Sequence, residues 1–366
     1  MPTKRLPQKP DLAHLKYQAR DLLADRLAGK PDSCQRIREF HPRFHRSSDS
    51  HIQSARFNLS DAYLAIAREY GFASWARLRA HVTSPTNLDL PQHERIDDSV
   101  FRLALGLVDD VDVEGLRSYL SEHPAVVYQR VAFEGSNYFR NPSLLEFIAE
   151  NPIRHGRLDP GVIDIATVIL DAGARSDQAA LDSTLCLVCS GSVSRECGVQ
   201  IPLIRLLVRY GAEAAAAMNA AIVHGEFEAT EELLRCGARL DLAAAAALGQ
   251  AAVVSEQLRA STAETRHIAL ALACQHGRIG VVRLLLDAAE DPNRYNPVGF
   301  HAHSTPLHQA ALAGHFDVVR MLVERGARRD LKDIHYNGTA ADWAQHAGRD
   351  EIAEYLRHTT GNHRSL

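Results

Sequence analysis

The chain has 366 residues, of which 46% are hydrophobic and 23% charged, and this composition excludes a wholly disordered protein. No apolar run approaches the roughly 20 residues that a membrane span needs, and the N-terminal stretch up to Pro10 lacks the apolar core of a secretion signal. The net charge of −4 is unevenly spread: 15 basic and 8 acidic residues stand up to His81, against 26 and 37 in the remainder. This asymmetry indicates a basic N-terminal unit followed by an acidic body.

Residues 1–83 are predicted to form a small helical unit. Residues 12–28, 59–70 and 74–82 each carry apolar side chains at helical spacing, and a glycine closes each of the first two segments. The polar stretch 44–52 is predicted to be a loop.

Residues 100–358 are predicted to form a solenoid, with a linker before it at 84–99 and a disordered tail after it at 359–366. Apolar stripes recur along this region, each followed by a turn glycine. The turn glycines Gly225, Gly249, Gly277, Gly314 and Gly348 are unevenly spaced. The shortest interval, from Gly225 to Gly249, holds two helices and no β-hairpin finger, so residues 213–289 are predicted to be bare helix pairs. The segment 296–304 is instead predicted to be an unusually long finger.

The clearest repeat begins at Thr305, which can cap a helix whose first residue is Pro306. Gly314 suits the left-handed conformation that ends such a helix. The stretch TPLHQAA at 305–311, and a restart one repeat later at Thr339, closely resemble the ankyrin repeat. The resemblance implies an all-α, ankyrin-repeat α-solenoid with some short β-hairpin fingers, in which His308 and His315 are structural.

The resemblance extends to a group of bacterial ankyrin-repeat proteins. The stretches 12–16 and 66–75 are similar to the N-terminal helical segment of that group, and 142–146 and 299–308 are similar to its repeats. The group implies an architecture and no particular activity. Ankyrin proteins in general bind partner proteins through finger tips and the concave surface of the inner helices, a pattern from which the bare middle repeats depart.

The fingers supply the candidate contact residues. Aromatic side chains on an exposed finger are suited to anchor a partner, and a neighbouring cation or imidazole adds polar contacts. The predicted partner-binding residues are Tyr138, Phe139, Arg140, Phe300, His301, His303, His335 and Tyr336. For the two adjacent aromatic residues of the early finger, packing against the neighbouring repeat is an equal alternative.

The histidines, 19 in all, allow an alternative interpretation. His301 and His335 are separated by the same interval as Thr305 and Thr339, so they occupy equivalent places on adjacent fingers and are predicted to stack as neighbours. Together with His303 and Asp333 they provide imidazole and carboxylate groups, which bind divalent metals and transfer protons. An enzyme or a small-ligand or metal-binding protein with a pocket at His301, His303, Asp333 and His335 is therefore the alternative to protein binding.

The cysteines give a weaker signal. Cys186, Cys189 and Cys197 could hold zinc, but no second CxxC pair follows, so buried thiols are favoured and no metal or cofactor is predicted. The six sparse cysteines fit reduced thiols and a cytoplasmic location.

The basic residues of the N-terminal unit include Arg68, Arg77 and Arg79, which are expected on its outside. They are scattered, so a solvated face or docking onto the acidic solenoid is favoured over nucleic-acid binding. The sequence contains no phosphate-binding glycine loop, nucleophile elbow or HExxH motif. We therefore expect a protein that binds another protein, with no covalent chemistry and no membrane association; the partner's identity and the oligomeric state stay open.

Overall fold

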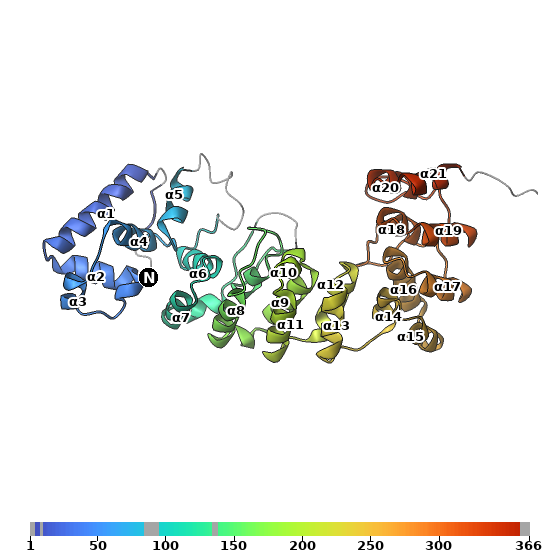
Figure 1. Cartoon of the computed structure of the whole chain (residues 1–366), viewed down its shortest axis with the longest axis horizontal. Coiled ribbons are helices and arrows are strands. Elements are labelled where there is room, and N and C mark those ends of the chain that lie inside the picture. The colour runs from blue at the N-terminus through green and yellow to red at the C-terminus, as the bar shows by residue number, and fades with distance from the viewer. Residues whose placement is uncertain (1–3, 8–9, 84–94, 134–137, 359–366) are drawn as a thin grey trace, which may run out of the picture. The chain divides into compact units, whose positions relative to one another are not determined.

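The computed structural model describes residues 4–7, 10–83, 95–133 and 138–358. The predicted tail at 359–366 and most of the predicted linker lie outside the described residues, and the proposed domain boundaries stay predictions. The described chain is helical apart from turns, loops and two isolated β-bridges, Arg130–Ser143 and Lys332–Thr339, which confirms the all-α class. It divides into two compact units, unit 1 (Met1–Glu213) and unit 2 (Ala214–Leu366), which are described separately below (Figure 1). Among the described residues, no helix is long and apolar enough to cross a membrane.

The N-terminal helices of unit 1 share a hydrophobic core of their own. Asp11 caps the first helix by accepting a hydrogen bond from the Ala13 amide at 2.8 Å, and Asn58 caps the fourth with the Ser60 amide, also at 2.8 Å. Both caps satisfy amides that have no partner inside the helix. The elements are α1 (Leu12–Leu27), α2 (Pro31–Phe40), η1 (Pro42–Phe44), α3 (Asp49–Ser54), α4 (Leu59–Glu69) and α5 (Trp75–Thr83).

The prediction of a loop at 44–52 holds for residues 45–48 and is wrong from Asp49 on. The segment includes the start of α3, whose N-cap Ser48 accepts a hydrogen bond from the His51 amide at 3.2 Å. Phe44 and Ile52 are both buried in the core of the N-terminal helices. Two well-placed apolar residues are therefore enough to fix a stretch whose composition is otherwise polar.

The rest of unit 1 is built of further helix pairs. The first pair consists of α6 (Ser99–Asp109) and α7 (Val113–Glu122), which pack on one another. Helix α7 in turn packs on α8, and α8 on α11. The remaining elements are η4 (Pro124–Tyr128), η5 (Leu145–Ala149), α8 (Val162–Asp171), η6 (Ala174–Ser176), α9 (Gln178–Ser190), α10 (Ser192–Glu196) and α11 (Gln200–Arg209).

Unit 2 is a stack of helix pairs in two layers. The first helices of successive pairs, α14, α16, α18 and α20, pack on one another as an inner layer, while α15, α17 and α19 form the outer layer (Figure 1). The elements are η7 (Ala214–Ala217), α12 (Met218–Val223), α13 (Phe227–Arg235), α14 (Leu242–Leu248), α15 (Ala251–Gln257), η8 (Leu258–Ala260), α16 (Ala263–Gln275), α17 (Ile279–Asp287), α18 (Pro306–Ala313), α19 (Phe316–Glu324), α20 (Ala340–His346) and α21 (Asp350–His358).

The repeat boundaries follow the predicted turn residues. Gly314 ends α18 with φ of +88°, a left-handed conformation that side chains other than glycine adopt at a cost. Thr305 begins the same helix, and its amide donates to Nδ1 of His308 at 3.3 Å. The described chain carries no β-bridge between residues 214 and 289, so the bare middle repeats are confirmed.

Candidate partner-binding site

The finger at 332–339 is a rigid turn built around Asp333. Its carboxylate accepts hydrogen bonds from the amides of His335, Tyr336 and Gly338 at 2.7–2.9 Å and from the indole of Trp343 at 3.0 Å. Burial alone would raise the pKa of Asp333, but these hydrogen bonds outweigh it and lower the pKa to about 2. The carboxylate thus stays ionised and holds the finger in one conformation.

The C-terminal histidines stack, but the pairing differs from the prediction. The His335 ring stacks on His303, with 4.7 Å between centroids and 27° between planes, whereas His301 meets His303 edge-on at 6.3 Å. The two fingers are also joined by a hydrogen bond from the Ile334 amide to the His303 carbonyl at 2.8 Å. His301 has a left-handed backbone with φ of +63°. This turn lies two residues before His303, which contacts the second finger.

The tip of this double finger is exposed and apolar. Tyr336 is 79% exposed and Ile334 is 64% exposed, and His335 beside them is also exposed. Tyr295 is partly exposed, and its hydroxyl donates to the Lys332 carbonyl at 2.6 Å. We refer to Tyr295, Ile334, His335 and Tyr336 as the finger-tip patch. Its backbone is fixed while its side chains face solvent, which is the arrangement that a contact surface requires.

Phe300 does not belong to this patch, and its predicted role as an exposed anchor is wrong. The side chain is 7% exposed and packs in a cluster with Ile222, Ala247 and Leu272. The sequence places Phe300 on a long finger. Because the middle repeats have no fingers of their own, apolar side chains of their inner helices are free to pack against the Phe300 ring and bury it.

The early finger in unit 1 is only partly described, because residues 134–137 lie outside the described residues. Tyr138 is 69% exposed and donates a hydrogen bond to Oδ1 of Asn151 at 2.5 Å, and Arg140 is exposed. Phe139 is 6% exposed and packs edge-on against Phe147 at 5.1 Å. Tyr138 and Arg140 are therefore accessible and stay predicted contact residues, whereas Phe139 belongs to the core.

The alternative pocket for catalysis or metal binding finds little support in this geometry. Asp333 is 3% exposed and already accepts four hydrogen bonds, so it cannot turn its oxygens toward the histidines without undoing the finger. Within the described residues, no group of three or more His, Cys, Asp or Glu side chains could hold a metal ion.

Other histidines and the cysteines have structural surroundings. Nε2 of His308 lies 3.2 Å from the Gly338 carbonyl, and Nε2 of His315 lies 3.0 Å from the Gln275 carbonyl, so each links one repeat to another. No disulfide bond joins the six cysteines, all of which lie in the described part of the chain; Cys189 is buried, and burial raises the pKa of Cys186. Sγ of Cys197 accepts a hydrogen bond from the Leu158 amide at 3.3 Å.

Two of the three arginines expected on the outside of the N-terminal unit, Arg68 and Arg77, are ion-paired, and for Arg68 the expected exposure is wrong. Arg68 is 12% exposed and lies 3.4 Å from Asp112, and Arg77 reaches Asp110 at 3.0 Å. Arg79 is exposed, as predicted. Because both acids lie at the turn between α6 and α7, the basic helices dock onto the acidic body, which was one of the two expected arrangements.

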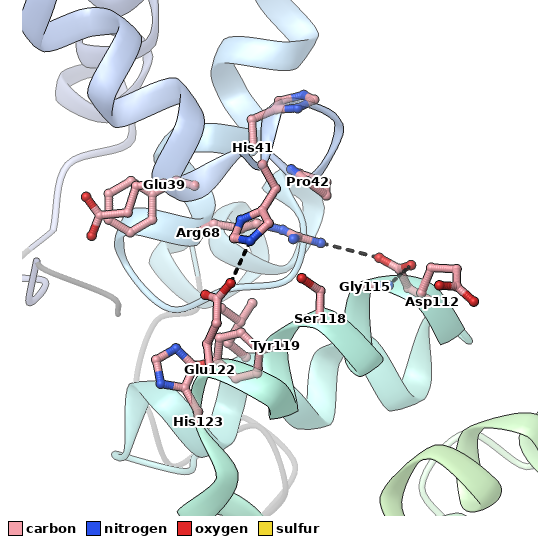
Figure 2. Close-up of a pocket in the computed structure, with 14 residues that line it drawn as sticks. Glu39, His41, Pro42, Arg68, Asp112, Gly115, Ser118, Tyr119, Glu122 and His123 are labelled. Atoms are coloured by element: carbon pink, nitrogen blue, oxygen red, sulfur yellow. Dashed lines mark hydrogen bonds and ion pairs between the residues drawn. The ribbon is translucent and has the colours of Figure 1, made fainter. Parts of the chain in front are cut away.

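A cavity of about 270 Å³ lies at this junction within unit 1 (Figure 2). Its walls come from the end of α2 and the segment after it on one side and from α7 on the other. His45 pairs with Glu122 across it at 2.8 Å, and the Tyr119 hydroxyl donates to the Val100 carbonyl at 3.1 Å. No local sequence signal marks this cavity, because its walls come from segments that lie far apart in the chain.

Comparisons with known proteins agree with the repeat geometry. The family description "Ankyrin repeats (3 copies)" matches residues 242–333 and 270–364. Cyclin-dependent kinase 4 inhibitor B from Bos taurus is 32% identical over 130 residues, which are 34% of this chain and 96% of the relative. Ankyrin repeat and SAM domain-containing protein 6 from Mus musculus is 37% identical over 93 residues, which are 25% of this chain and only 10% of the relative. Cyclin-dependent kinase inhibitor 2A from Homo sapiens is 33% identical over 88 residues, 24% of this chain and 54% of the relative.

Proposed function

The chain belongs to the ankyrin-repeat family and is a protein–protein interaction module, and from this premise we propose that it engages its partner through the finger-tip patch of unit 2. The observation that carries the proposal is the combination of a fixed backbone and exposed aromatic side chains at one place. Tyr336 is 79% exposed on a turn that the Asp333 carboxylate holds through three backbone amides.

Preorganisation is the physical reason to prefer this patch. A partner that binds Tyr336 and Ile334 does not have to order the loop that carries them, so less conformational entropy is lost on binding. Tyrosine is enriched among the residues that dominate binding energy, because its ring covers a large area with few rotatable bonds. The neighbouring imidazole of His335 adds a polar contact at the edge.

The relatives support a protein as the partner. Two of them are named as inhibitors of cyclin-dependent kinases, and so act on other proteins. We propose no kinase for this chain. Six sparse cysteines without a disulfide bond support a cytoplasmic location, and the N-terminal stretches 12–16 and 66–75 support kinship with the bacterial group.

Site-specific photocrosslinking in living cells tests the proposal. A benzophenone amino acid is placed at position 336 of the full chain, and, as a matched control, at the exposed Tyr17 of unit 1, which is 59% exposed. We expect one protein to be captured at position 336 and not at position 17.

The captured protein is then purified and its affinity measured. Tyr336→Ala is expected to weaken binding about tenfold or more, which corresponds to about 1.4 kcal/mol, while Tyr17→Ala changes it less than about twofold. Equal effects of the two substitutions would show that the finger-tip patch is not the contact surface.

A further inference from the structure

The inner helices of the middle repeats have two buried faces. One packs against the outer helices; the other would be open to solvent in a repeat that has no finger, and yet it is buried as well. On α16, Leu270 and Cys274 face the main core of unit 2, while Leu272 and Ile268 belong to a separate cluster. Ala247 of α14 and Ile222 of α12 join Leu272 in this second cluster. Residues four apart lie on one side of a helix, so Ile268 and Leu272 form a stripe that points away from the outer helices.

The side chain that covers this stripe is Phe300. It lies in no helix and belongs to the segment between α17 and α18, and yet it is only 7% exposed. Beneath it Ala247 and Leu272 are fully buried. The long finger before Thr305 therefore provides, in the folded chain, an aromatic side chain for an apolar groove on neighbouring repeats.

The conformation of this segment is that of a tight double turn. The Phe300 amide donates to the Pro297 carbonyl and the Ser304 amide to the His301 carbonyl, each at 3.0 Å. Left-handed backbone at Gly299 and His301, with φ of +88° and +63°, flanks the phenylalanine. The two turns push Phe300 out as the apolar side chain that enters the groove, whereas Val298 nearby is 90% exposed.

The segment is attached to the rest of unit 2 at its two ends, where Tyr295 and His303 also contact the finger at 332–339. Nε2 of His267 lies 2.9 Å from the Tyr295 carbonyl at one end, and the Gln309 amide group donates to Oγ of Ser304 at 2.8 Å at the other. Asn296 is buried, and neither its Oδ1 nor its Nδ2 has a hydrogen-bond partner within the described part of the chain. Buried polar groups without partners destabilise the closed arrangement, so displacement of the segment recovers their solvation.

We propose that the inner face of α12, α14 and α16 is a binding groove for a peptide turn that presents one aromatic side chain, and that residues 295–304 are its intramolecular ligand. The proposal rests on the proposed function in that the chain binds proteins, but it concerns a second surface. A partner with an aromatic turn competes with Phe300, and binding there requires that the turn carrying Phe300 leave the groove, while Tyr295 and His303 stay attached to the second finger. Ligand sites of this kind are largely apolar, and the residues with which Phe300 packs are apolar as well.

A peptide-binding assay on the full chain tests this. The probe is a fluorescent peptide with the sequence of residues 294–305, and a second peptide carries alanine at the phenylalanine position. We expect Phe300→Ala protein to bind the first peptide at least tenfold more tightly than wild type or the Val298→Ala control, and no variant to bind the second peptide. A folded Phe300→Ala protein, judged by circular dichroism, with no gain in peptide affinity would overturn the proposal.

Hydrogen exchange on the wild-type chain gives an independent test that does not depend on the fold of a variant. The amides of Phe300 and Ser304 are expected to exchange at least tenfold faster than those of α16 and α18, because the segment opens while the helices stay closed. Exchange at the same rate would show that Phe300 is ordinary core and would refute the proposal. Tyr336→Ala should leave peptide binding and the exchange of the segment unchanged, so failure of the finger-tip patch is distinguishable from failure of the groove.

Discussion

Two equivalent positions in unit 2 show how differently the same repeat surface is used. Ala247 and Leu312 each stand two positions before a left-handed turn glycine, Gly249 and Gly314, at the end of an inner helix. Ala247 is fully buried, whereas the larger Leu312 is 37% exposed. The smaller side chain is the more buried one because Phe300, from the segment between α17 and α18, packs over Ala247 in the middle repeats. Leu312, in the later repeat, stays partly open to solvent.

This difference shows that the repeats without a finger are also the ones whose inner helices are covered by another segment of the chain. The middle repeats have no hairpin of their own, and their inner layer is instead closed by Phe300 from a neighbouring segment. The C-terminal repeats keep their fingers, and these carry the exposed Tyr336 and Ile334. One end of unit 2 therefore offers an open surface and the middle a closed one.

The largest expected effect comes from removing a side chain beneath the covering segment. Leu272→Ala should lower the free energy of unfolding by about 2–5 kcal/mol, because the fully buried residue leaves a cavity. Leu312→Ala, on the open part of the inner layer, should change it by no more than about 0.5 kcal/mol. Urea unfolding of both variants measures the two changes in unfolding free energy. Equal changes would show that the two positions do not differ in burial as the structure indicates.

A smaller effect is expected from acid. Burial is the main cause that lowers the pKa of His276 to about 4, with Arg278 and His315 adding to it, although the hydrogen bond to the Ile222 carbonyl opposes the shift. Since the unfolded chain binds this proton near pH 6.5, His276 contributes stability above pH 6.5 that is lost as the pH falls toward 4. The loss is as much as about 3 kcal/mol at this site.

The control for the acid effect is His276→Gln, whose amide can still donate to the Ile222 carbonyl. The difference in unfolding free energy between wild type and this variant should shrink between pH 6.5 and pH 4, as measured by denaturant titrations at each pH. A difference that does not change with pH would mean that His276 is not kept neutral by its surroundings.

The turn at the boundary between two helices gives an effect of middle size. Gly314→Val is expected to cost on the order of 1–2 kcal/mol from the backbone alone, because φ there is +88°. The side chain of Arg349 lies close to the position of an added Cβ, and since it is long and flexible it can move aside. A thermal melting curve identical to that of the wild type would contradict the backbone argument.

How much of this fold can be predicted depends on the kind of signal. The caps and turn glycines of the last repeats, such as Thr305 and Gly314, are local features, and the structure confirms them. The short polar helices α2 and α3 escape prediction, because they are held mainly by core contacts of residues such as Ile37 and Ile52. Tertiary packing overrides weak local preference in such segments.

The candidate site is predictable in its location but not in its detail. The sequence places aromatic and histidine side chains on fingers, and Tyr336 and His335 are indeed exposed there. It does not reveal that Phe300 is buried, because the surface that buries it belongs to helices α12, α14 and α16, well before it in the chain. The repeat spacing likewise pairs His335 with His301, although the ring on which it stacks is His303.

The smallest stability effect is expected at the tip of the double finger, and it separates a contact surface from a structural one. His335→Ala combined with Tyr336→Ala should shift the unfolding free energy by no more than about 0.5 kcal/mol, because both side chains are exposed. Asp333→Ala in the same finger should cost about 1–3 kcal/mol, because three backbone amides and the Trp343 indole lose their acceptor. Denaturant unfolding of the two variants measures both. If the double variant is destabilised as much as Asp333→Ala, the tip contributes to the fold itself and cannot be a free surface for a partner.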